Sequence, residues 1–382
     1  MLAYFAIRFG QVAIGAVLPA VIETFDTDAG TVGFALAGMW VAYALVQLPS
    51  GALGDRYGER PVILGAVGLA TLAAVGIALA PTLPLLVVAV VVLGVGSGLY
   101  YNAATALLSR SVDAIGRAIG LHRVGGQGAG LIAPIVAAGL AVRVGWRAAF
   151  GLAAVVGVGT VIALARGVRP VTPTRPDRPL RAVFAPRRLW GLLTRPGIAY
   201  ATAVGGIGEF VSTATSAFLV TFLVQHHDLP VDVAGAVLGG YFAALVAAQP
   251  LVGWTSDRIG RDPALGLVFA CGVVGYGALP TTTALPALAG AVLLCGVAMS
   301  WSPAVQARVL TRLDGDDRGP GFGVVRTGYI LLGAVGTAVT GALADAAGWV
   351  VAVHVLVGLL LVGILLVGAV TVAGHRPARP AA

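Results

Sequence analysis

The sequence has little charge and little cysteine for its length. Charged residues make up 10% of the 382 residues, whereas 58% are hydrophobic. Such a composition leaves too little polar surface to cover a water-soluble domain. The two cysteines, Cys271 and Cys295, each lie in an apolar segment, so they are interpreted as small hydrophobic side chains and not as a disulfide or a metal pair. We therefore expect a protein that folds in a lipid bilayer.

Long apolar segments recur along the whole chain. A helix needs about 20 apolar residues to cross a bilayer. We count twelve such segments: 2–24, 31–54, 62–80, 84–109, 114–142, 147–166, 198–224, 233–255, 264–281, 285–309, 319–344 and 349–373. Runs such as 62–80 are apolar on every side, unlike the alternating strands of a membrane barrel. The first segment has no basic leader and no cleavage site, so we expect a membrane helix there and not a signal peptide. The sequence predicts an all-α membrane protein with twelve transmembrane helices.

Lysine is absent, and all 24 basic residues are arginine. Basic residues in short loops favour the cytoplasmic side of a membrane. With a cytoplasmic N-terminus, only Arg143 and Arg147 fall in outer loops and only Arg8, Arg123 and Arg326 fall within spans, which leaves 19 of the 24 arginines in cytoplasmic loops and tails. We expect a multi-pass protein of the plasma membrane with both termini in the cytoplasm. The net charge of +8 then reflects topology and contact with lipid headgroups, and no nucleic-acid partner is expected.

One arginine-rich and proline-rich stretch divides the chain. Residues 166–197 hold eight arginines and several prolines, which resist regular structure. We predict an N-terminal six-helix bundle over 1–166, a cytoplasmic linker over 167–197 and a C-terminal six-helix bundle over 198–375. For the later part of the linker, a short amphipathic helix on the membrane surface and a solvated segment remain as alternatives.

An internal repeat supports two related bundles. The segment from Gly51 to Gly58 recurs from Gly253 to Gly260, a shift of 202 positions. A second match pairs residues 120–146 with residues 323–349 at a shift of 203, so that Arg123 corresponds to Arg326. Parallel repeats with a substrate site at their interface are one architecture of secondary transporters. We therefore expect two pseudo-symmetric six-helix bundles.

Two motifs carry a family resemblance. Gly51-x-Leu53-x-Asp55-Arg56-x-Gly58-x-Arg60, between the second and third spans, resembles the signature loop of the major facilitator superfamily, and Gly145-Trp146-Arg147-x-x-Phe150 is also typical of it. The resemblance implies the major facilitator fold, solute transport and alternating access. The same resemblance implies that Asp55 meets the start of the eleventh helix and holds the cytoplasmic side closed, since a helix N-terminus favours a negative charge. The predicted switch residues are Gly51, Asp55, Arg56, Gly58 and Arg60, with Asp257 and Arg258 in the second copy. The alternative is that these charges only end the helix and mark topology.

Polar residues are unevenly distributed among the spans, and several pairs lie three or four positions apart on one helix face. In the fold resembled, such residues line a central cavity. The predicted substrate-binding residues are Arg8, Tyr43, Gln47, Tyr101, Asn102, Arg123, Gln127, Tyr241, Gln249, Trp301, Arg326 and Tyr329. Two alternatives stay open: the uncharged side chains can simply join neighbouring helices, and Arg8 and Arg123 can extend to the cytoplasmic interface.

Glu209 is the one carboxylate that we place deep in a span, which suggests a proton-coupling residue. Three arginines against this single acid predict a small anionic organic solute, carried by alternating access, with proton coupling as a secondary hypothesis. Arg8 is similar to a substrate-binding arginine in the first helix of some organic-anion carriers of the superfamily. We expect solute, lipid and protons or another coupling ion as partners, and a monomer.

Other functions have less support in the sequence. A proton-driven exporter of hydrophobic drugs is the alternative, although Val90 stands where similar drug antiporters carry an arginine. Five histidines and two cysteines form no nucleophile–base pair and no metal-ligand pattern, so we expect no enzyme, no cofactor and no metal. A receptor or scaffold without transport activity would not need arginines at membrane depth in both halves of the chain.

Overall fold

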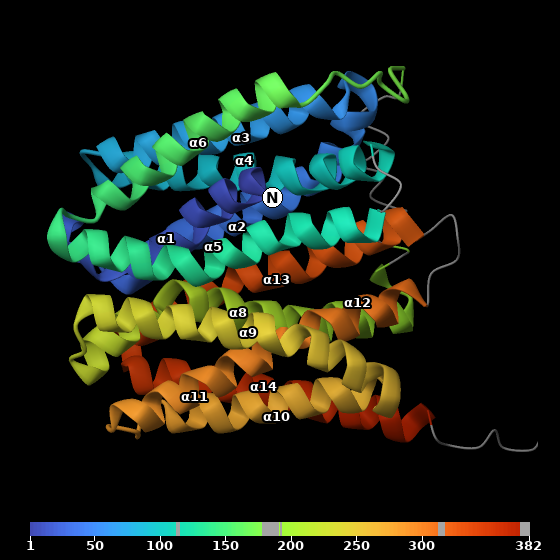
Figure 1. Cartoon of the computed structure of the whole chain (residues 1–382). Helices are drawn as coiled ribbons and strands as arrows, with labels where there is room; N and C mark the ends of the chain where they lie inside the picture. The colour runs from blue at the N-terminus through green and yellow to red at the C-terminus, as the bar shows by residue number, and fades with distance from the viewer. Residues whose placement is uncertain (112–114, 178–190, 192, 312–317, 375–382) are drawn as a thin grey trace, which may run out of the picture.

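The computed structural model describes residues 1–111, 115–177, 191, 193–311 and 318–374 (Figure 1). Regular structure in these residues is helical, as the sequence predicts. The helices are α1 (Leu2–Phe25), α2 (Ala29–Tyr57), α3 (Glu59–Leu79), α4 (Leu83–Ser111), α5 (Ile115–Arg143), α6 (Arg147–Gly167), α8 (Pro196–His227), α9 (Val231–Ile259), α10 (Arg261–Ala278), α11 (Leu285–Ala298), η2 (Met299–Trp301), α12 (Ser302–Leu310), α13 (Arg318–Ala347) and α14 (Trp349–Gly374).

Eleven stretches of helix in the described ranges are long and apolar enough to cross a membrane. They lie in α1 to α6, α8, α9, α13 and α14, and in residues 285–309. The remaining predicted span corresponds to α10, which has 18 residues and begins with Arg261 and Asp262. The protein is therefore a multi-pass membrane protein.

One predicted span is interrupted. Residues 285–309 form α11, one turn of 3-10 helix and α12 instead of a continuous helix, because Ser300 leaves helical geometry with φ −82° and ψ 18°. Pro303 in the first turn of α12 has no N–H to donate to the preceding turn. The Ser300 hydroxyl donates to the carbonyl of Val297, one turn earlier, at 2.5 Å.

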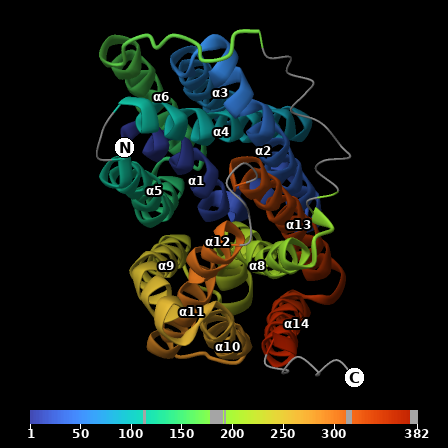
Figure 2. The same cartoon turned by 90° about the vertical axis from the view of Figure 1, so that its right-hand side faces the viewer.

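The helices run side by side with their connections at two ends. The α2–α3 and α9–α10 turns and residues 168–177 lie at one end, here called the linker end, on the right in Figure 1. The α1–α2, α5–α6 and α13–α14 turns lie at the opposite end, here called the far end. Figure 2 shows α1–α6 above and α8–α14 below, with α13 reaching up beside α2. These two groups meet where α2 packs on α13, α5 on α9 and α1 on α8.

The repeat is visible in the backbone. Among the described residues, the left-handed conformation occurs at six positions, which pair off as Asp26 with Asp228, Gly58 with Gly260 and Gly145 with Gly348. These pairs are separated by 202, 202 and 203 positions, the same shifts that relate the repeated motifs. Each member ends a helix or leads into the next, so the two groups of helices turn in the same way at equivalent positions.

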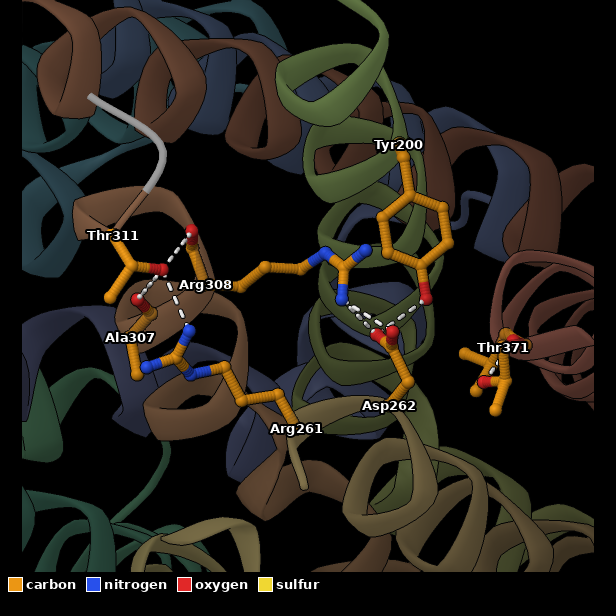
Figure 3. Close-up of polar contacts among 8 residues, drawn as sticks. Tyr200, Arg261, Asp262, Ala307, Arg308, Thr311 and Thr371 are labelled. Atoms are coloured by element: carbon orange, nitrogen blue, oxygen red, sulfur yellow. Dashed lines mark hydrogen bonds and ion pairs between the residues drawn. The ribbon is translucent and has the colours of Figure 1, made fainter. Parts of the chain in front are cut away.

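Two ion pairs at the linker end join corresponding helices, and their acidic partners, Glu59 and Asp262, are 203 positions apart. Arg110 at the end of α4 donates to Glu59 at the start of α3, at 2.6 Å. In the C-terminal group, Arg308 of α12 pairs with Asp262 at the start of α10 (Figure 3). Asp262 also accepts from the Tyr200 hydroxyl at 3.0 Å, and the Arg308 guanidinium carbon lies 4.4 Å from the centre of the Tyr200 ring. Each pair joins helices within one group.

The first part of the linker lies against the α2–α3 turn. The N–H of Arg175 donates to the Asp55 carbonyl at 2.9 Å, and the Thr174 hydroxyl donates to the Asp55 carboxylate at 3.2 Å. Gly58 adopts φ +86°, and a Cβ there would lie 2.9 Å from the carbonyl oxygen of Val171. A side chain at position 58 would therefore be strained and would push the linker away.

Candidate functional site

A cavity of about 230 Å³ lies between the two groups of helices. Its walls come from α1, α2, α4 and α5 on one side and from α8, α9, η2, α12 and α13 on the other. Ten residues predicted for substrate binding or proton coupling line it: Arg8, Tyr43, Tyr101, Arg123, Gln127, Glu209, Gln249, Trp301, Arg326 and Tyr329. No described residue of α3, α6, α10 or α14 does so.

Three residues predicted for the site lie outside the cavity wall. Asn102 donates from its side-chain amide to the backbone carbonyl of Gln47 at 2.7 Å, a bond that joins α4 to α2. Gln47 is 3% exposed and Tyr241 is fully buried behind Phe242, which does reach the cavity. For these three, the structure shows contacts between helices.

Other wall residues carry no signal that marks them in the sequence. These residues of the cavity wall are Tyr4, Trp40, Ser212, Thr213, Ser216, Phe242 and Phe322. Serine, threonine and aromatic side chains are common in any membrane helix, so only their helix faces set these apart. Arg8 on α1 and Arg326 on α13 do mark the helix faces that line the cavity, and one turn before them on the same faces lie Tyr4 and Phe322.

Arg326 connects the two groups of helices. From α13, its Nη2 donates to the Tyr43 hydroxyl of α2 at 3.3 Å, and its guanidinium carbon lies 4.3 Å from the centre of the Tyr101 ring of α4. An arginine held over an aromatic ring is stabilised by roughly 0.5–2 kcal/mol. None of the ion pairs in the described residues includes Arg326. A guanidinium fixed in this way has N–H groups left for an anion.

The other two arginines differ in exposure. Arg8 is half-buried and donates to the side-chain carbonyl of Gln11, three residues along α1, at 3.0 Å. Arg123 is exposed and lines the cavity from α5. Arg123 and Arg326 thus lie on the same cavity from corresponding helices, with Arg326 the more enclosed of the two.

Glu209 of α8 is the only carboxylate that lines the cavity in the described residues. Its side chain packs so closely on Gly333 of α13 that a Cβ there would overlap it. The positive charges of Arg326 and Arg8 act on it, yet neither forms an ion pair with it within 4.0 Å in the described part of the chain. The carboxylate therefore faces the cavity without a fixed ionic partner.

A polar contact also crosses between α5 and α9. The side-chain amide of Gln127 donates to the side-chain carbonyl of Gln249 at 3.2 Å. Both residues line the cavity, and each belongs to a different group of helices. This hydrogen bond must break if the two helices separate.

At the far end, α2 and α13 meet closely. Asp345 of α13 accepts hydrogen bonds from the backbone N–H groups of Ala29 at 3.2 Å and Gly30 at 2.5 Å, in the first turn of α2. A Cβ at Gly33 would lie 2.5 Å from the Thr337 carbonyl oxygen, and one at Gly341 would overlap the Ala29 carbonyl. The two backbones are in direct contact, so the far end is closed between these helices.

The predicted switch residues surround the α2–α3 turn. Besides the contacts of Asp55 with the linker, Arg60 donates to the Ala165 carbonyl at 2.7 Å and Arg56 lies over Tyr57. In the second copy, Arg258 lies over Trp254 and Asp257 is exposed. Residues 312–317, which lead into α13, are outside the described ranges. The contact of Asp55 with the start of that helix therefore stays a prediction.

Comparison with known proteins gives one consistent result. The sequence profile of the Major Facilitator Superfamily matches residues 1–229 and 202–382. Among curated proteins, the chain is 29% identical over 180 residues to an uncharacterized MFS-type transporter of Mycobacterium tuberculosis, covering 47% of this chain and 31% of that protein. It is 25% identical over 167 residues to the multidrug resistance protein MdtL of Escherichia coli, covering 42% and 43%. The chain thus spans less than half the length of these relatives.

A longer match and two solved structures agree. The enterobactin exporter EntS of Salmonella choleraesuis is 25% identical over 304 residues, which is 77% of this chain and 71% of that protein. The inward-facing, occupied crystal structure of a bacterial homologue of the human lysosomal transporter Spinster matches with a TM-score of 0.82 at 17% identity, covering 100% and 97%. The nucleoside transporter NupG matches with a TM-score of 0.83 at 12% identity, covering 96% and 97%. At these identities the structures show the fold alone.

The profile match extends over the whole chain, and the curated relatives and solved neighbours are transporters. The fold, the cavity between two repeated groups of helices and the α2–α3 turn agree with it. The chain therefore belongs to the major facilitator superfamily of membrane transporters.

Proposed function

We propose that this protein is a secondary active transporter that carries a small organic anion across the plasma membrane by alternating access. The observation that carries the proposal is Arg326, held by Tyr43 and Tyr101 on the cavity wall without an ionic partner among the described residues. The charged residues on that wall are Arg8, Arg123, Arg326 and Glu209, so an empty cavity has an excess of positive charge. An anionic solute would neutralise part of that charge.

The architecture proposed for this cycle has twelve transmembrane helices. Residues 1–166 and 198–375 are two pseudo-symmetric six-helix bundles, and 167–197 is a cytoplasmic linker. The paired left-handed residues and the paired ion pairs support this division. We place both termini and the linker end in the cytoplasm because the arginines concentrate there. The structure would then be closed on the outer side.

Alternating access would take place by rocking of the two bundles about the cavity. The contacts between bundles are of two kinds: those at the far end between α2 and α13, and those beside the cavity through Arg326, Gln127 and Gln249. Opening outward requires the first kind to break. An anion on Arg326 would compete with Tyr43 for the guanidinium and would so weaken the contacts beside the cavity. Binding would in this way be linked to the conformational change.

Glu209 is the proposed site of proton coupling. It lies on the cavity wall within the electrostatic influence of Arg326 and Arg8. A protonated Glu209 would leave Arg326 and Arg8 to the substrate, whereas an ionised one would compete with it. Uptake or release of one proton at this carboxyl would therefore alter anion affinity.

Liposomes test the proposal directly. The purified full-length protein, reconstituted with an internal organic anion such as benzoate, should exchange it for labelled external anion. Liposomes without protein and liposomes that contain the Arg326→Gln variant should show no exchange. Exchange of neutral or cationic solutes with no exchange of any organic anion would refute the anion proposal.

Export of hydrophobic drugs is the second candidate. MdtL is named a multidrug resistance protein and EntS an enterobactin exporter, and eight of the 24 cavity residues are aromatic. A drug exporter of this kind would bind hydrophobic cations or neutral compounds and would depend on Glu209 more than on Arg326. Transport of such a compound that survives Arg326→Gln and is lost in Glu209→Gln would favour this candidate.

A further inference from the structure

The cavity wall is unusually rich in aromatic side chains. Eight of the 24 lining residues are Phe, Trp or Tyr, whereas these residues are 7% of the whole chain. A site for a small hydrophilic anion, such as phosphate, would leave most of these rings in contact with water. The composition of the wall therefore points to a solute with an apolar, planar part as well as a charge.

The position of the rings is fixed by glycines on the neighbouring helices. A Cβ at Gly208 of α8 would lie 2.6 Å from the Trp301 ring, and one at Gly130 of α5 would lie 2.9 Å from the Phe242 ring. Each ring therefore packs directly on the backbone of a neighbouring helix, with no side chain between them. Trp301 also packs perpendicular to Tyr329, with ring centres 5.5 Å apart. These contacts leave the rings little freedom to move away, so they form a prepared surface for a flat ligand.

The charged position is equally well defined. Arg326 has one guanidinium face over Tyr101 and one nitrogen near the Tyr43 hydroxyl. Tyr329, one turn along α13 from Arg326, lines the same cavity as Trp301. A ligand whose anionic group is at Arg326 can therefore place its body toward the Trp301–Tyr329 pair.

The volume limits the size of the ligand. A cavity of about 150 Å³ is enough to bind benzene. The cavity here, about 230 Å³, has room for one ring with a carboxylate and a small substituent. A fused or multi-ring solute would need a wider state of the protein.

We propose that the transported anion is a one-ring aromatic carboxylate, with its carboxylate on Arg326 and its ring against Trp301 and Tyr329. The proposal rests on the proposed function, since it names the class of anion that the same cavity takes. It excludes short aliphatic acids and inorganic anions as preferred substrates. It also ranks saturated rings of similar size below aromatic ones, because a saturated ring lacks the π-system that the two aromatic side chains recognise.

Isothermal titration calorimetry of the purified full-length protein would test this with matched probes. Benzoate and cyclohexanecarboxylate share a charge and a six-membered ring, and the second is the more hydrophobic. Benzoate should bind about 3- to 10-fold more tightly, and acetate, phosphate and neutral benzamide should bind more weakly than either. Equal or tighter binding of cyclohexanecarboxylate would overturn the aromatic inference and leave the anion transporter intact. Binding of benzamide or tetraphenylphosphonium with no binding of any anion would overturn both.

Variants locate the recognition surface. The ratio of the affinity for benzoate to the affinity for cyclohexanecarboxylate should fall to about 1 in Trp301→Leu. Gly208→Ala, which displaces the Trp301 ring, should also lower this ratio. Trp254→Leu is the matched control, because Trp254 is exposed and outside the cavity. The preference is a ratio measured on one sample, so a loss of folded protein does not change it. An unchanged ratio in Trp301→Leu would refute the assignment of this surface.

Discussion

The carboxylate of Asp345 in α13 accepts a hydrogen bond of 2.5 Å from the backbone N–H of Gly30, in the first turn of α2. The two residues are 315 positions apart and belong to different groups of helices. A second bond, from the N–H of Ala29, places the negative charge at the positive end of the α2 dipole. This contact closes the far end, and it is the counterpart of the one that the sequence predicts for Asp55 at the linker end.

Asp345→Asn should favour the state that is open at the far end. The amide keeps the shape and loses the charge, which at an exposed helix N-terminus is worth about 1 kcal/mol, or roughly a 5-fold change in population. Spin labels on cysteines at exposed Glu23 and Ala346, in a Cys271→Ala and Cys295→Ala background, should show a larger fraction of long distances. An unchanged distance distribution would mean that the glycine contacts alone hold this end closed.

Asp55→Asn should increase the population that is open at the linker end and slow transport while substrate still binds. Cysteine accessibility at both ends measures the shift. Thr174→Ala separates two causes, because Thr174 donates to the same carboxylate from the linker. If Thr174→Ala reproduces the effect, Asp55 acts through the linker. If neither variant changes accessibility or flux, Asp55 only marks topology.

Glu209→Gln should abolish proton-driven accumulation and preserve exchange of substrate across the membrane. The glutamine keeps the volume at the Gly333 contact but cannot take up or release a proton. Counterflow and pH-driven uptake in the same liposomes distinguish the two activities. Glu23→Gln, at an exposed end of α1, is the control. Normal accumulation by Glu209→Gln would remove it as the coupling site.

Arg326→Lys should weaken anion binding about 10- to 100-fold, because the charge remains and the planar fork over Tyr101 is lost. Arg326→Gln should nearly eliminate binding. Arg143→Gln, at an exposed position outside the cavity, should bind normally. Titration calorimetry with benzoate gives all three values. Normal affinity in both Arg326 variants would show that the anion binds elsewhere.

Asp28→Ala should destabilise the start of α2 in a pH-dependent way. Asp28 caps this helix by accepting from the Thr31 N–H at 2.6 Å, which lowers the pKa of the carboxyl below its ordinary value. A lowered pKa means that the stabilising contribution is present above the ordinary pKa of aspartate and is lost as the pH falls through the lower, folded value. The difference in melting temperature between Asp28→Ala and the parent protein should therefore shrink in acid. A constant difference would show that the charge is not involved.

The sequence predicts the helices well because crossing a bilayer requires long apolar runs, and their ends coincide with charge, glycine and proline. Ser300 is different. The break beside it depends on Pro303, which has no N–H, and on the local backbone geometry of Ser300, and a hydropathy profile detects neither.

The site is predicted to the level of helices but not of individual side chains. Tyr101 and Asn102 are adjacent polar residues on α4, and the sequence does not distinguish them. In the structure, the Tyr101 ring lies under Arg326, whereas Asn102 donates to the Gln47 carbonyl. Adjacent residues on a helix differ by about 100° in direction, and only the packing of α4 against α2 decides which faces the cavity. The contacts of Asp345 cannot be predicted from the sequence, because its partners are backbone N–H groups, which carry no signature of their own.

The interruption at Met299–Trp301 places a candidate hinge in the cavity wall. α11 and α12 occupy one span, but Trp301, Ser302 and Gln306 lie on the side of the break that faces the cavity. A tilt of α12 about Ser300 would change the width of the cavity, and the Arg308–Asp262 ion pair that ties α12 to α10 would limit its size. In the proposed transport cycle, this small hinge would fit the cavity wall to the bound solute, and the larger exchange of open ends would move the solute across.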